Sequence, residues 1–303
     1  MAMVTDTRLL RLGVPKRSRP RLLARQDYPA ALAFCHSLGA DGVMAGHRLA
    51  QAISAPVSSG EVWALEHPGA RPAGQRLRSE HLRALMWAAG SLMPVGADST
   101  TATAFLPMVR DRGNRYASMV GDAAAVAALW ARLAPAWPPP RAYRQAQPLM
   151  AIGGPGEGAA DPLVKPATPD MLDRIVPACR AMFTEELGFP PPGPPEAYRA
   201  HVANQIGRGA LLARLEPSTG EVVFKAELGA DCGRWVQVQG VWTNPAYRGR
   251  GIAKAGMVAV IAHARACGRD RVCLYVNDFN APALAVYRAV GFTQVGTWAT
   301  VLL

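Results

Sequence analysis

The sequence has few cysteines, few aromatic residues and no long apolar stretch, and each scarcity excludes a class of protein. Its five cysteines are widely spaced and never form a C-x-x-C pair, so the sequence indicates neither a disulfide framework nor a metal site. No apolar run approaches the ~20 residues that a membrane-spanning helix needs. Hydrophobic residues make up 50% of the chain and charged residues 18%, which excludes a mainly disordered protein. We therefore expect a globular protein that contacts no membrane.

The chain length predicts the number of domains, and the N-terminal residues and cysteines predict the cellular compartment. The 303 residues are about twice the length of a usual single domain, so two domains are expected. The start, MAMVTDTRLLRLGVPKRSRP, is basic but has no apolar stretch of signal-peptide length. Because unpaired cysteines are typical of a reducing compartment, the expected location is the cytoplasm.

Acidic residues are scarce in the first half. Residues 1–150 hold 18 Lys and Arg against 9 Asp and Glu, whereas residues 151–303 hold 15 against 13. Residues 1–25 alone hold seven of these basic residues, so we interpret them as a solvated basic tail. Such a tail could contact phosphates or acidic partners. Nucleic-acid binding is the weaker hypothesis, because the sequence has no helix-turn-helix, zinc or RNA-binding signature.

Proline and glycine divide the chain. Residues 151–166, AIGGPGEGAADPLVKP, interrupt the apolar pattern on both sides, so we expect a linker between a domain at 26–150 and another at 167–303. In the second domain, apolar periodicity and turn residues predict two helices, a meander of three antiparallel strands, and then helix, strand, helix and strand. The expected bounds are 169–187, 196–206, 210–215, 222–228, 236–243, 251–266, 272–276, 282–290 and 292–301.

One motif joins a strand to a helix through a glycine-rich arginine loop. It reads QGVWTNPAYRGRGIAKAG over residues 239–256. Gly249 and Gly251 let the backbone approach a ligand closely, and the free N–H groups and dipole of the following helix favour an anion. Arg248 and Arg250 can add charge-assisted contacts. The loop suits a pyrophosphate, although a glycine turn that only caps a helix has the same pattern.

A second motif follows in LYVNDFNAPALAVYRAVGF, residues 274–292. Asn280 stands after a predicted strand, and Ala283 and Tyr287 follow three and seven residues later. The three therefore lie along one face of the predicted helix. Tyr287 can project into the same cleft as the arginine-glycine loop, or it can simply pack against the sheet.

With both motifs in this order, residues 167–303 resemble the GNAT superfamily of acyl-CoA-dependent N-acetyltransferases. RGRGIA at 248–253 matches its R/Q-x-x-G-x-G/A pyrophosphate loop, with Ala253 in place of the final glycine. NAPALAVYRAVGF at 280–292 matches its later motif. The wider pattern is similar to a GNAT subfamily with an N-terminal domain of unknown function. The resemblance implies an α/β fold of α+β type, with a mixed, mostly antiparallel sheet flanked by helices.

The resemblance also implies acetyl-CoA as cosubstrate, no metal, and direct attack on the thioester by a primary amine of a small molecule or a protein. The backbone of residues 241–243 would hold the pantetheine arm and offer an N–H to the oxyanion. Asn280 would bind pantetheine amides, and Tyr287 would protonate the leaving thiolate. The expected cofactor-binding residues are Val241, Trp242, Thr243, Arg248, Gly249, Arg250, Gly251, Ile252, Ala253, Asn280, Ala283 and Tyr287.

The base that takes the amine proton has three carboxylate candidates. Glu227 lies on a strand beside apolar neighbours, a setting that can raise the pKa of a carboxyl group. Glu185 and Glu186 precede the proline-rich loop at 189–195, where this superfamily builds its acceptor wall. Solvated or ion-paired carboxylates fit the pattern equally well, and a water chain could serve instead. The expected catalytic residues are Tyr287, Glu227 and Glu186.

Residues 82–133 repeat the order of strands and helices of the second half, but they lack the arginine-glycine loop and the Asn/Tyr motif. We therefore expect residues 26–150 to form a degenerate GNAT-like domain, with fold convergence as the alternative. The function expected for the whole chain is N-acetylation, and the alternative is a CoA-binding regulatory protein that has lost turnover. The sequence names neither the acceptor nor the oligomeric state, monomer or homodimer.

Overall fold

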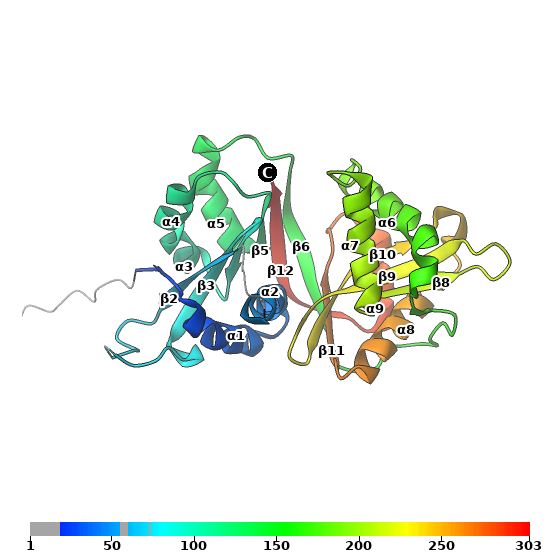
Figure 1. Ribbon diagram of the computed structural model, residues 1–303, viewed down its shortest axis with the longest axis horizontal. Coiled ribbons are helices and arrows are strands. Elements are labelled where there is room, and N and C mark those ends of the chain that lie inside the picture. The colour runs from blue at the N-terminus through cyan, green and yellow to red at the C-terminus, as the bar shows by residue number, and fades with distance from the viewer. Residues whose placement is uncertain (1–18, 55–59, 73) are drawn as a thin grey trace, which may run out of the picture.

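A computed structural model describes residues 19–54, 60–72 and 74–303. Its strands form a 12-stranded sheet in the order β1-β2-β3-β4-β5-β12-β6-β11-β10-β9-β8-β7, which runs through both halves of the chain (Figure 1). The strands are β1 (Arg21–Leu22), β2 (Glu61–Glu66), β3 (Leu82–Ala88), β4 (Ser91–Val95), β5 (Ser118–Asp122), β6 (Ala142–Ile152), β7 (Lys165–Pro166), β8 (Leu211–Leu215), β9 (Val222–Cys232), β10 (Trp235–Thr243), β11 (Arg271–Tyr275) and β12 (Thr293–Leu302). The α-helices are α1 (Tyr28–Ser37), α2 (Val43–Ser54), α3 (Ser99–Ala104), α4 (Leu106–Arg112), α5 (Ala123–Leu133), α6 (Leu172–Leu187), α7 (Pro195–Gly207), α8 (Ile252–Ala266) and α9 (Ala281–Val290).

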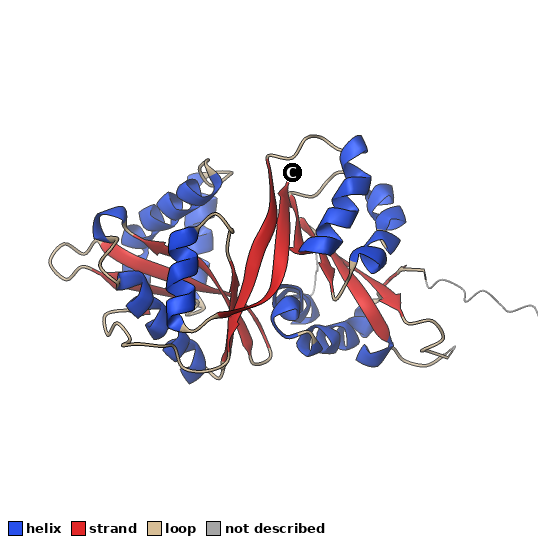
Figure 2. Ribbon diagram, turned by 180° about the vertical axis from the view of Figure 1, so that it is seen from behind, coloured by secondary structure: helices blue, strands red, loops and turns tan. Residues whose placement is uncertain are grey.

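The second half contains the predicted elements in the predicted order. Strands β8, β9 and β10 form the expected antiparallel meander, although β9 continues beyond the predicted end to Cys232. Among the described residues, β4 with β5 and β10 with β11 are the parallel pairs, and the other paired strands are antiparallel. The mixed, mostly antiparallel sheet flanked by helices is therefore confirmed (Figure 2).

Helices cover both faces of the sheet in each half. In the first half, α1 and α2 pack in one apolar cluster and α3, α4 and α5 in another. In the second half, α8 and α9 pack on one face, while α6 and α7 pack on the other. The parallel pair β4 and β5, with helices between them in sequence, has its counterpart in β10 and β11 with α8. No helix in the described parts of the chain is long and apolar enough to cross a membrane.

The two halves exchange strands at the centre of the sheet, which corrects the expected domain boundaries. The final strand β12 lies between β5 and β6, so it pairs with two strands of the first half. Strand β6 in turn pairs with β11, with Val272 opposite Ile152 and Tyr275 opposite Leu149. Residues 26–150 and 167–303 are therefore not separate structural units, because each half contributes a strand next to the other.

The expected linker at 151–166 belongs to the folded second half. Its first two residues, Ala151 and Ile152, are buried at the end of β6. Further along, Glu157 N–H donates to Val290 O at 2.8 Å, and Asp161 forms an ion pair with Arg214 at 2.8 Å. Between β6 and β7, at residues 153–164, the chain forms no helix or strand, but its backbone and side chains still bond to α9 and to β8.

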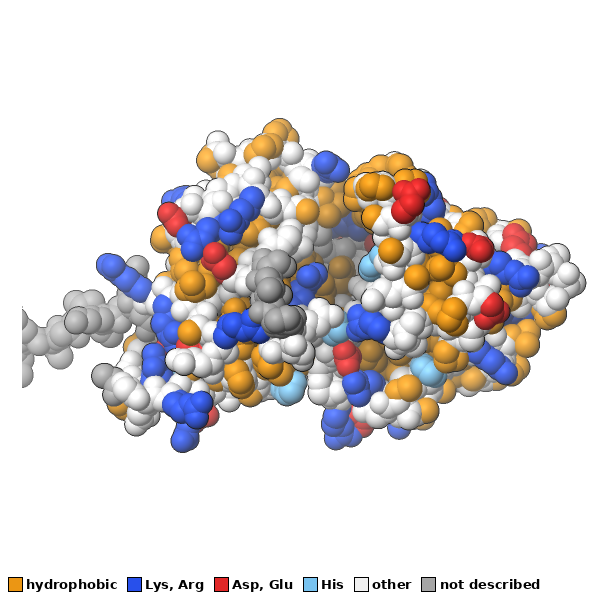
Figure 3. All heavy atoms as spheres, viewed as in Figure 1, with side chains coloured by type: hydrophobic (Ala, Val, Ile, Leu, Met, Phe, Trp, Pro, Cys, Tyr) orange, Lys and Arg blue, Asp and Glu red, His pale blue; other side chains and the backbone are white. Residues whose placement is uncertain are grey.

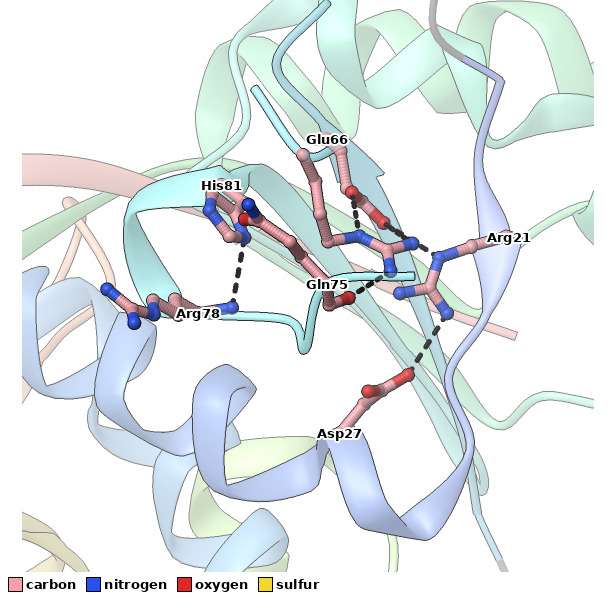
Figure 4. A network of polar contacts seen from close by, with 7 residues as sticks. Arg21, Asp27, Glu66, Gln75, Arg78 and His81 are labelled. Atoms are coloured by element: carbon pink, nitrogen blue, oxygen red, sulfur yellow. Dashed lines mark hydrogen bonds and ion pairs between the residues drawn. The ribbon is translucent and has the colours of Figure 1, made fainter. Parts of the chain in front are cut away.

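The boundary expected after residue 25 is also wrong for residues 21–25. Strand β1 pairs with β2, and Leu23 is only 3% exposed. Arg21 contacts Glu66 at 2.7 Å and Asp27 at 3.1 Å, and Arg71 approaches the other oxygen of Glu66 at 2.9 Å (Figure 4). Residues 21–25 are therefore folded although they are rich in basic residues. An arginine at the edge of a sheet is compatible with a buried neighbour when carboxylates pair with it. Residues 1–18 of the expected tail lie outside the described residues.

Candidate active site

A cavity of about 860 Å³ opens in the second half between α6, the start of α8 and the strands β9, β10 and β11. All but one of the residues expected to bind the cofactor or act in catalysis line this cavity; the exception is Arg250. Residues distant in the sequence therefore meet in one place. Those that line it are Glu186, Glu227, Val241, Trp242, Thr243, Arg248, Gly249, Gly251, Ile252, Ala253, Asn280, Ala283 and Tyr287.

The cavity forms where two parallel strands diverge. Strands β10 and β11 pair from Trp235 to Gln237 and no further, so residues 241–243 face the cavity instead of β11. On the other side, β10 keeps its pairing with β9 through a bulge between Gln239 and Trp242. Gly240 in this bulge has φ +60°, and a Cβ there would lie 2.8 Å from Glu227 Oε1. Only glycine fits this close approach, which keeps the Glu227 carboxylate beside the strand.

The arginine-glycine loop presents backbone to the cavity. Gly249 and Gly251 both have φ +75°, a left-handed conformation that favours glycine, and a Cβ at either position would have no neighbour within 4 Å. Helix α8 begins directly after Gly251, and no side chain caps its first turn. The N–H groups of that turn and the helix dipole are thus available to an anion, so the residues present fit a pyrophosphate.

The two arginines of the loop are engaged by protein groups. Arg248 donates to Thr243 O at 3.0 Å and forms an ion pair with Glu185 at 2.6 Å. Arg250 donates to Ala246 O at 3.2 Å and lies over the Tyr247 ring at 5.4 Å. The expected contacts of both guanidinium groups with a pyrophosphate would require these side chains to turn.

Helix α9 positions the residues of the second motif. Asn280 caps the helix, because its side chain accepts from Ala283 N–H at 3.2 Å. Its amide oxygen is thereby occupied, which leaves the amide nitrogen for a ligand. Tyr287 is 7% exposed and still lines the cavity. Burial, assisted by the charge of Glu186, raises the pKa of the Tyr287 phenol, so the group keeps its proton at neutral pH as a general acid must.

Glu227 is ion-paired and not surrounded by apolar groups alone. Lys225 Nζ lies 2.6 Å from Glu227 Oε1, and the Lys225 side chain is wholly buried. Burial disfavours the charged lysine, but the pair with Glu227 and the contact with Cys179 outweigh it and raise the pKa of Lys225. The ion-paired alternative for Glu227 is therefore the one that the structure shows, since residues two apart on a strand point to the same face.

Glu185 and Glu186 connect the end of α6 to its neighbours. Glu185 accepts from Trp242 Nε1 at 3.2 Å in addition to its ion pair with Arg248. Arg144 of β6 donates to the Glu186 carboxylate at 3.4 Å and to the Glu186 backbone oxygen at 2.8 Å. In the described residues no cluster of three or more His, Cys, Asp or Glu is arranged to hold a metal ion.

A buried chain of polar side chains at the cavity has no counterpart among the residues expected from the sequence. Gln147 Nε2 donates to Asn277 Oδ1 at 2.9 Å, and Thr300 Oγ1 donates to Gln147 Oε1 at 2.6 Å. Gln147 and Asn277 also line the cavity. Gln147 lies on β6 and Thr300 on β12, so residues of both exchanged strands belong to this chain of hydrogen bonds beside the cavity. No local sequence signal indicates that these three side chains meet. The bulge at Gly240 could have been predicted, because a glycine inside a strand pattern often marks one.

Two family models match the chain. Residues 72–175 match a domain of unknown function (DUF4081), and residues 184–292 match the Acetyltransferase (GNAT) family. The second half of the chain thus carries a domain of the GNAT acetyltransferase family, and a domain of unknown function precedes it. This confirms the resemblance that the two motifs carry.

Curated relatives are similar to a part of the chain, and solved structures share its fold. A mycothiol acetyltransferase from Saccharomonospora viridis is 44% identical over 61 residues, which is 20% of this chain and 20% of that protein. The chain thus matches about a fifth of the length of this relative. A GCN5-related N-acetyltransferase from Sphaerobacter thermophilus has a TM-score of 0.59 at 16% identity, over 94% of this chain and 95% of its own. A tandem GNAT protein from the clavulanic acid biosynthesis pathway has a TM-score of 0.51 at 14% identity, over 93% and 97%. These two likenesses show the fold over nearly the whole chain.

Proposed function

We propose that the protein transfers the acetyl group of acetyl-CoA to a primary amine. One observation carries this proposal: the arginine-glycine loop, the divergence of β10 from β11 and the Tyr287 phenol all line one cavity. The loop backbone would bind the pyrophosphate, and residues 241–243 would bind the pantetheine arm between the strands. The thioester would then lie near Tyr287, whose phenol would serve as the acid. The family match at 184–292 supports the same activity.

The transfer needs two proton movements. The amine nitrogen attacks the thioester carbonyl, a C–N bond forms, and a backbone N–H of residues 241–243 stabilises the oxyanion of the tetrahedral intermediate. The C–S bond then breaks, and Tyr287 donates its proton to the departing thiolate. The amine proton leaves to Glu227 or to water. Glu186 was expected to be catalytic, but its carboxylate is paired with Arg144, so we propose a positioning role for it in the acceptor wall.

The name of the curated relatives does not identify the acceptor. The match covers 20% of one relative and 25% of another, so mycothiol is not carried over to this chain. We keep the cytoplasm as the proposed location, because the five cysteines are widely spaced in the sequence and form no C-x-x-C pair.

A panel of primary amines, with detection of the thiol released from acetyl-CoA, tests the proposal. We expect amine-dependent thiol release by the wild type and a large loss in Tyr287→Phe. Tyr143→Phe, on β6 and outside the residues that line the cavity, is the matched control and should keep full turnover. Acetyl-CoA binding without thiol release for any amine would contradict catalysis and favour the CoA-binding regulator.

A further inference from the structure

Asn277 presents an amide donor to the cavity without a protein partner. The residue lines the cavity two positions after β11 and is 6% exposed. Its Oδ1 accepts from Gln147 Nε2 at 2.9 Å, whereas no group within residues 19–54, 60–72 and 74–303 accepts from its Nδ2. The protein does not enclose Nδ2 completely, in contrast to the two polar side-chain atoms of Gln237, which are enclosed without a partner. A donor at the wall of a cavity is therefore available to a ligand.

A chain of three buried side chains fixes which end of the Asn277 amide faces the cavity. Thr300 Oγ1 lies 2.6 Å from Gln147 Oε1, a distance typical of a hydroxyl that donates to a carbonyl oxygen. The Gln147 oxygen therefore faces Thr300, and the Gln147 nitrogen faces Asn277. Because an amide nitrogen donates and does not accept, Asn277 must offer its oxygen to Gln147. The Asn277 nitrogen is thus left for the cavity.

The backbone holds this donor in place before any ligand arrives. Val276 N–H donates to Pro148 O on the neighbouring strand β6 at 3.2 Å. Asn280 N–H donates to Asn277 O at 3.0 Å, which ties the residue to the start of α9. With its backbone bonded on both sides and its side chain bonded to Gln147, Asn277 loses little conformational freedom when it binds a ligand.

The Asn277 side chain lies on the face of the sheet opposite the pyrophosphate loop. Side chains alternate along β6, so Met150 packs with α8, which begins at the loop, whereas Leu149 packs with α1 and α2. Gln147 has the alternation of Leu149. Its bond to Asn277 places the Asn277 side chain on the face of α1 and α2 as well. A pyrophosphate at the loop lies on the other face, which assigns Asn277 to the acceptor.

The candidate base Glu227 shares this face. Phe224 and Ala226 of β9 pack with α8, so Lys225 and Glu227, which alternate with them, point the other way. Glu227 lines the same cavity as Asn277. The surface is hollowed between the two halves of the chain (Figure 3). An acceptor whose amine meets Glu227 on this face therefore has the neutral donor of Asn277 within the same cavity.

We propose that Asn277 Nδ2 donates a hydrogen bond to a neutral oxygen of the acceptor, such as an amide carbonyl, and that Gln147 and Thr300 position it. The substrate class is then amines that carry an uncharged oxygen acceptor. A carboxylate or phosphate would lose more hydration than one neutral N–H returns, and the guanidinium of Arg144 is already paired with Glu186. The inference rests on the proposed acetyl transfer for the role of the ligand as acceptor, but not for the binding itself.

Calorimetry on the full chain saturated with CoA measures this contact without the chemistry. The probes are ω-amino N,N-dimethylamides with one to five methylene groups, and the branched alkylamines in which CH2–CH replaces C(=O)–N. The two members of a pair have the same shape, and only the dimethylamide has an oxygen acceptor. ω-Amino acids of the same lengths supply a charged oxygen. In the wild type we expect the dimethylamide to bind more tightly than the amino acid at the length that spans the site.

Two substitutions of Asn277 remove the donor in different ways. Asn277→Leu should lower the affinity ratio of dimethylamide to alkylamine about tenfold at that length, and the affinity for the alkylamine itself should change little. Asn277→Asp keeps an oxygen for Gln147 Nε2 and replaces only the Nδ2 donor, so the same fall is expected even if the leucine variant does not fold. Asn204→Asp, at an exposed asparagine of α7 outside the cavity, is the matched control and should leave the ratio unchanged.

Thr300→Val tests the positioning role. Thr300 does not line the cavity, but its hydroxyl is the donor that orients Gln147. Without it the Gln147 amide can turn, and Asn277 can then present its oxygen to the cavity. The affinity ratio should fall severalfold, while the affinities for the alkylamine and for acetyl-CoA stay unchanged. A merely structural role would move all three affinities together.

Turnover supplies the second readout. With the dimethylamide, Asn277→Leu should raise KM about tenfold and change kcat little, while the alkylamine should show no change in either. An unchanged affinity ratio at every length in a folded Asn277→Asp, or tighter binding of the amino acid than of the dimethylamide at every length, would overturn the inference. A fall of the ratio without any thiol release would contradict the acetyl transfer and leave the Asn277 contact standing. Thiol release with an unchanged ratio would do the reverse.

Discussion

Replacing Glu227 by glutamine perturbs both stability and chemistry, because its partner Lys225 is wholly buried. Removing one member of a buried ion pair costs about 3–5 kcal/mol, since the other charge stays uncompensated. Glutamine keeps a carbonyl acceptor, so we expect the lower end, about 3 kcal/mol. At roughly 2–4 °C per kcal/mol for domains of 150–250 residues, Tm should fall by about 6–12 °C. A Tm within about 1 °C of the wild type would refute the buried-pair reasoning.

The double variant Lys225→Met, Glu227→Gln separates the two effects. It removes both charges, so most of the lost stability should return. Thiol release is then measured well below each Tm. If Glu227 is the base, both variants stay slow and lose the ascending limb of the pH–rate profile. If water relays the proton, the double variant recovers activity together with stability, and the role of Glu227 as base is refuted.

Three further predictions concern Tyr287, the N-terminal segment and the exchanged strands. Tyr287→Phe should slow turnover by roughly 10²–10⁴-fold with acetyl-CoA affinity nearly unchanged, and a loss of less than threefold would contradict its role as acid. Because burial raises the pKa of Tyr287, its proton stays in place up to and beyond pH 10, so a falling limb between pH 7 and 9 that Tyr287→Phe removes would oppose the assignment. A chain that starts at Gln26 should unfold at a lower temperature than one that starts at Arg19, because it loses β1 and Leu23, whose burial contributes about 1.5–3 kcal/mol; equal midpoints would show that segment to be dispensable. Residues 167–303 alone should fail to give a folded monomer by circular dichroism and gel filtration, because β12 loses both of its neighbours and β11 loses β6.

Local patterns predict most of the second half, because its helices and strands follow from apolar periodicity and turn residues. The glycines at 249 and 251 and the Asn/Ala/Tyr spacing also indicate residues of the cavity, because backbone freedom and helical spacing are local properties. The strand exchange could not be predicted, because the sequence of β12 shows which residues are apolar but not which strands lie beside it.

Residue charge is a misleading guide in two places. The basic residues around Leu23 have the composition of a tail. The carboxylate partners of Arg21 are Glu66, which is remote in sequence, and Asp27, which lies in the turn that follows. Glu227 has apolar neighbours along its strand, whereas Lys225, two positions earlier, holds it in a buried pair. In both cases the decisive interaction is an ion pair, and composition alone does not show which charges meet.

Calorimetric titration with acetyl-CoA tests the central claim most directly when Gly251→Val is compared with Gly268→Val. The two glycines have φ +75° and +77°, and a Cβ at either would have no neighbour within 4 Å, so the backbone strain of the two substitutions is matched. Only Gly251 lines the cavity. The wild type and Gly268→Val should bind acetyl-CoA alike, while Gly251→Val should bind at least about tenfold more weakly, about 1.4 kcal/mol or more. Unchanged affinity in a folded Gly251→Val, or no binding by the wild type, would contradict the assignment of the acetyl-CoA site.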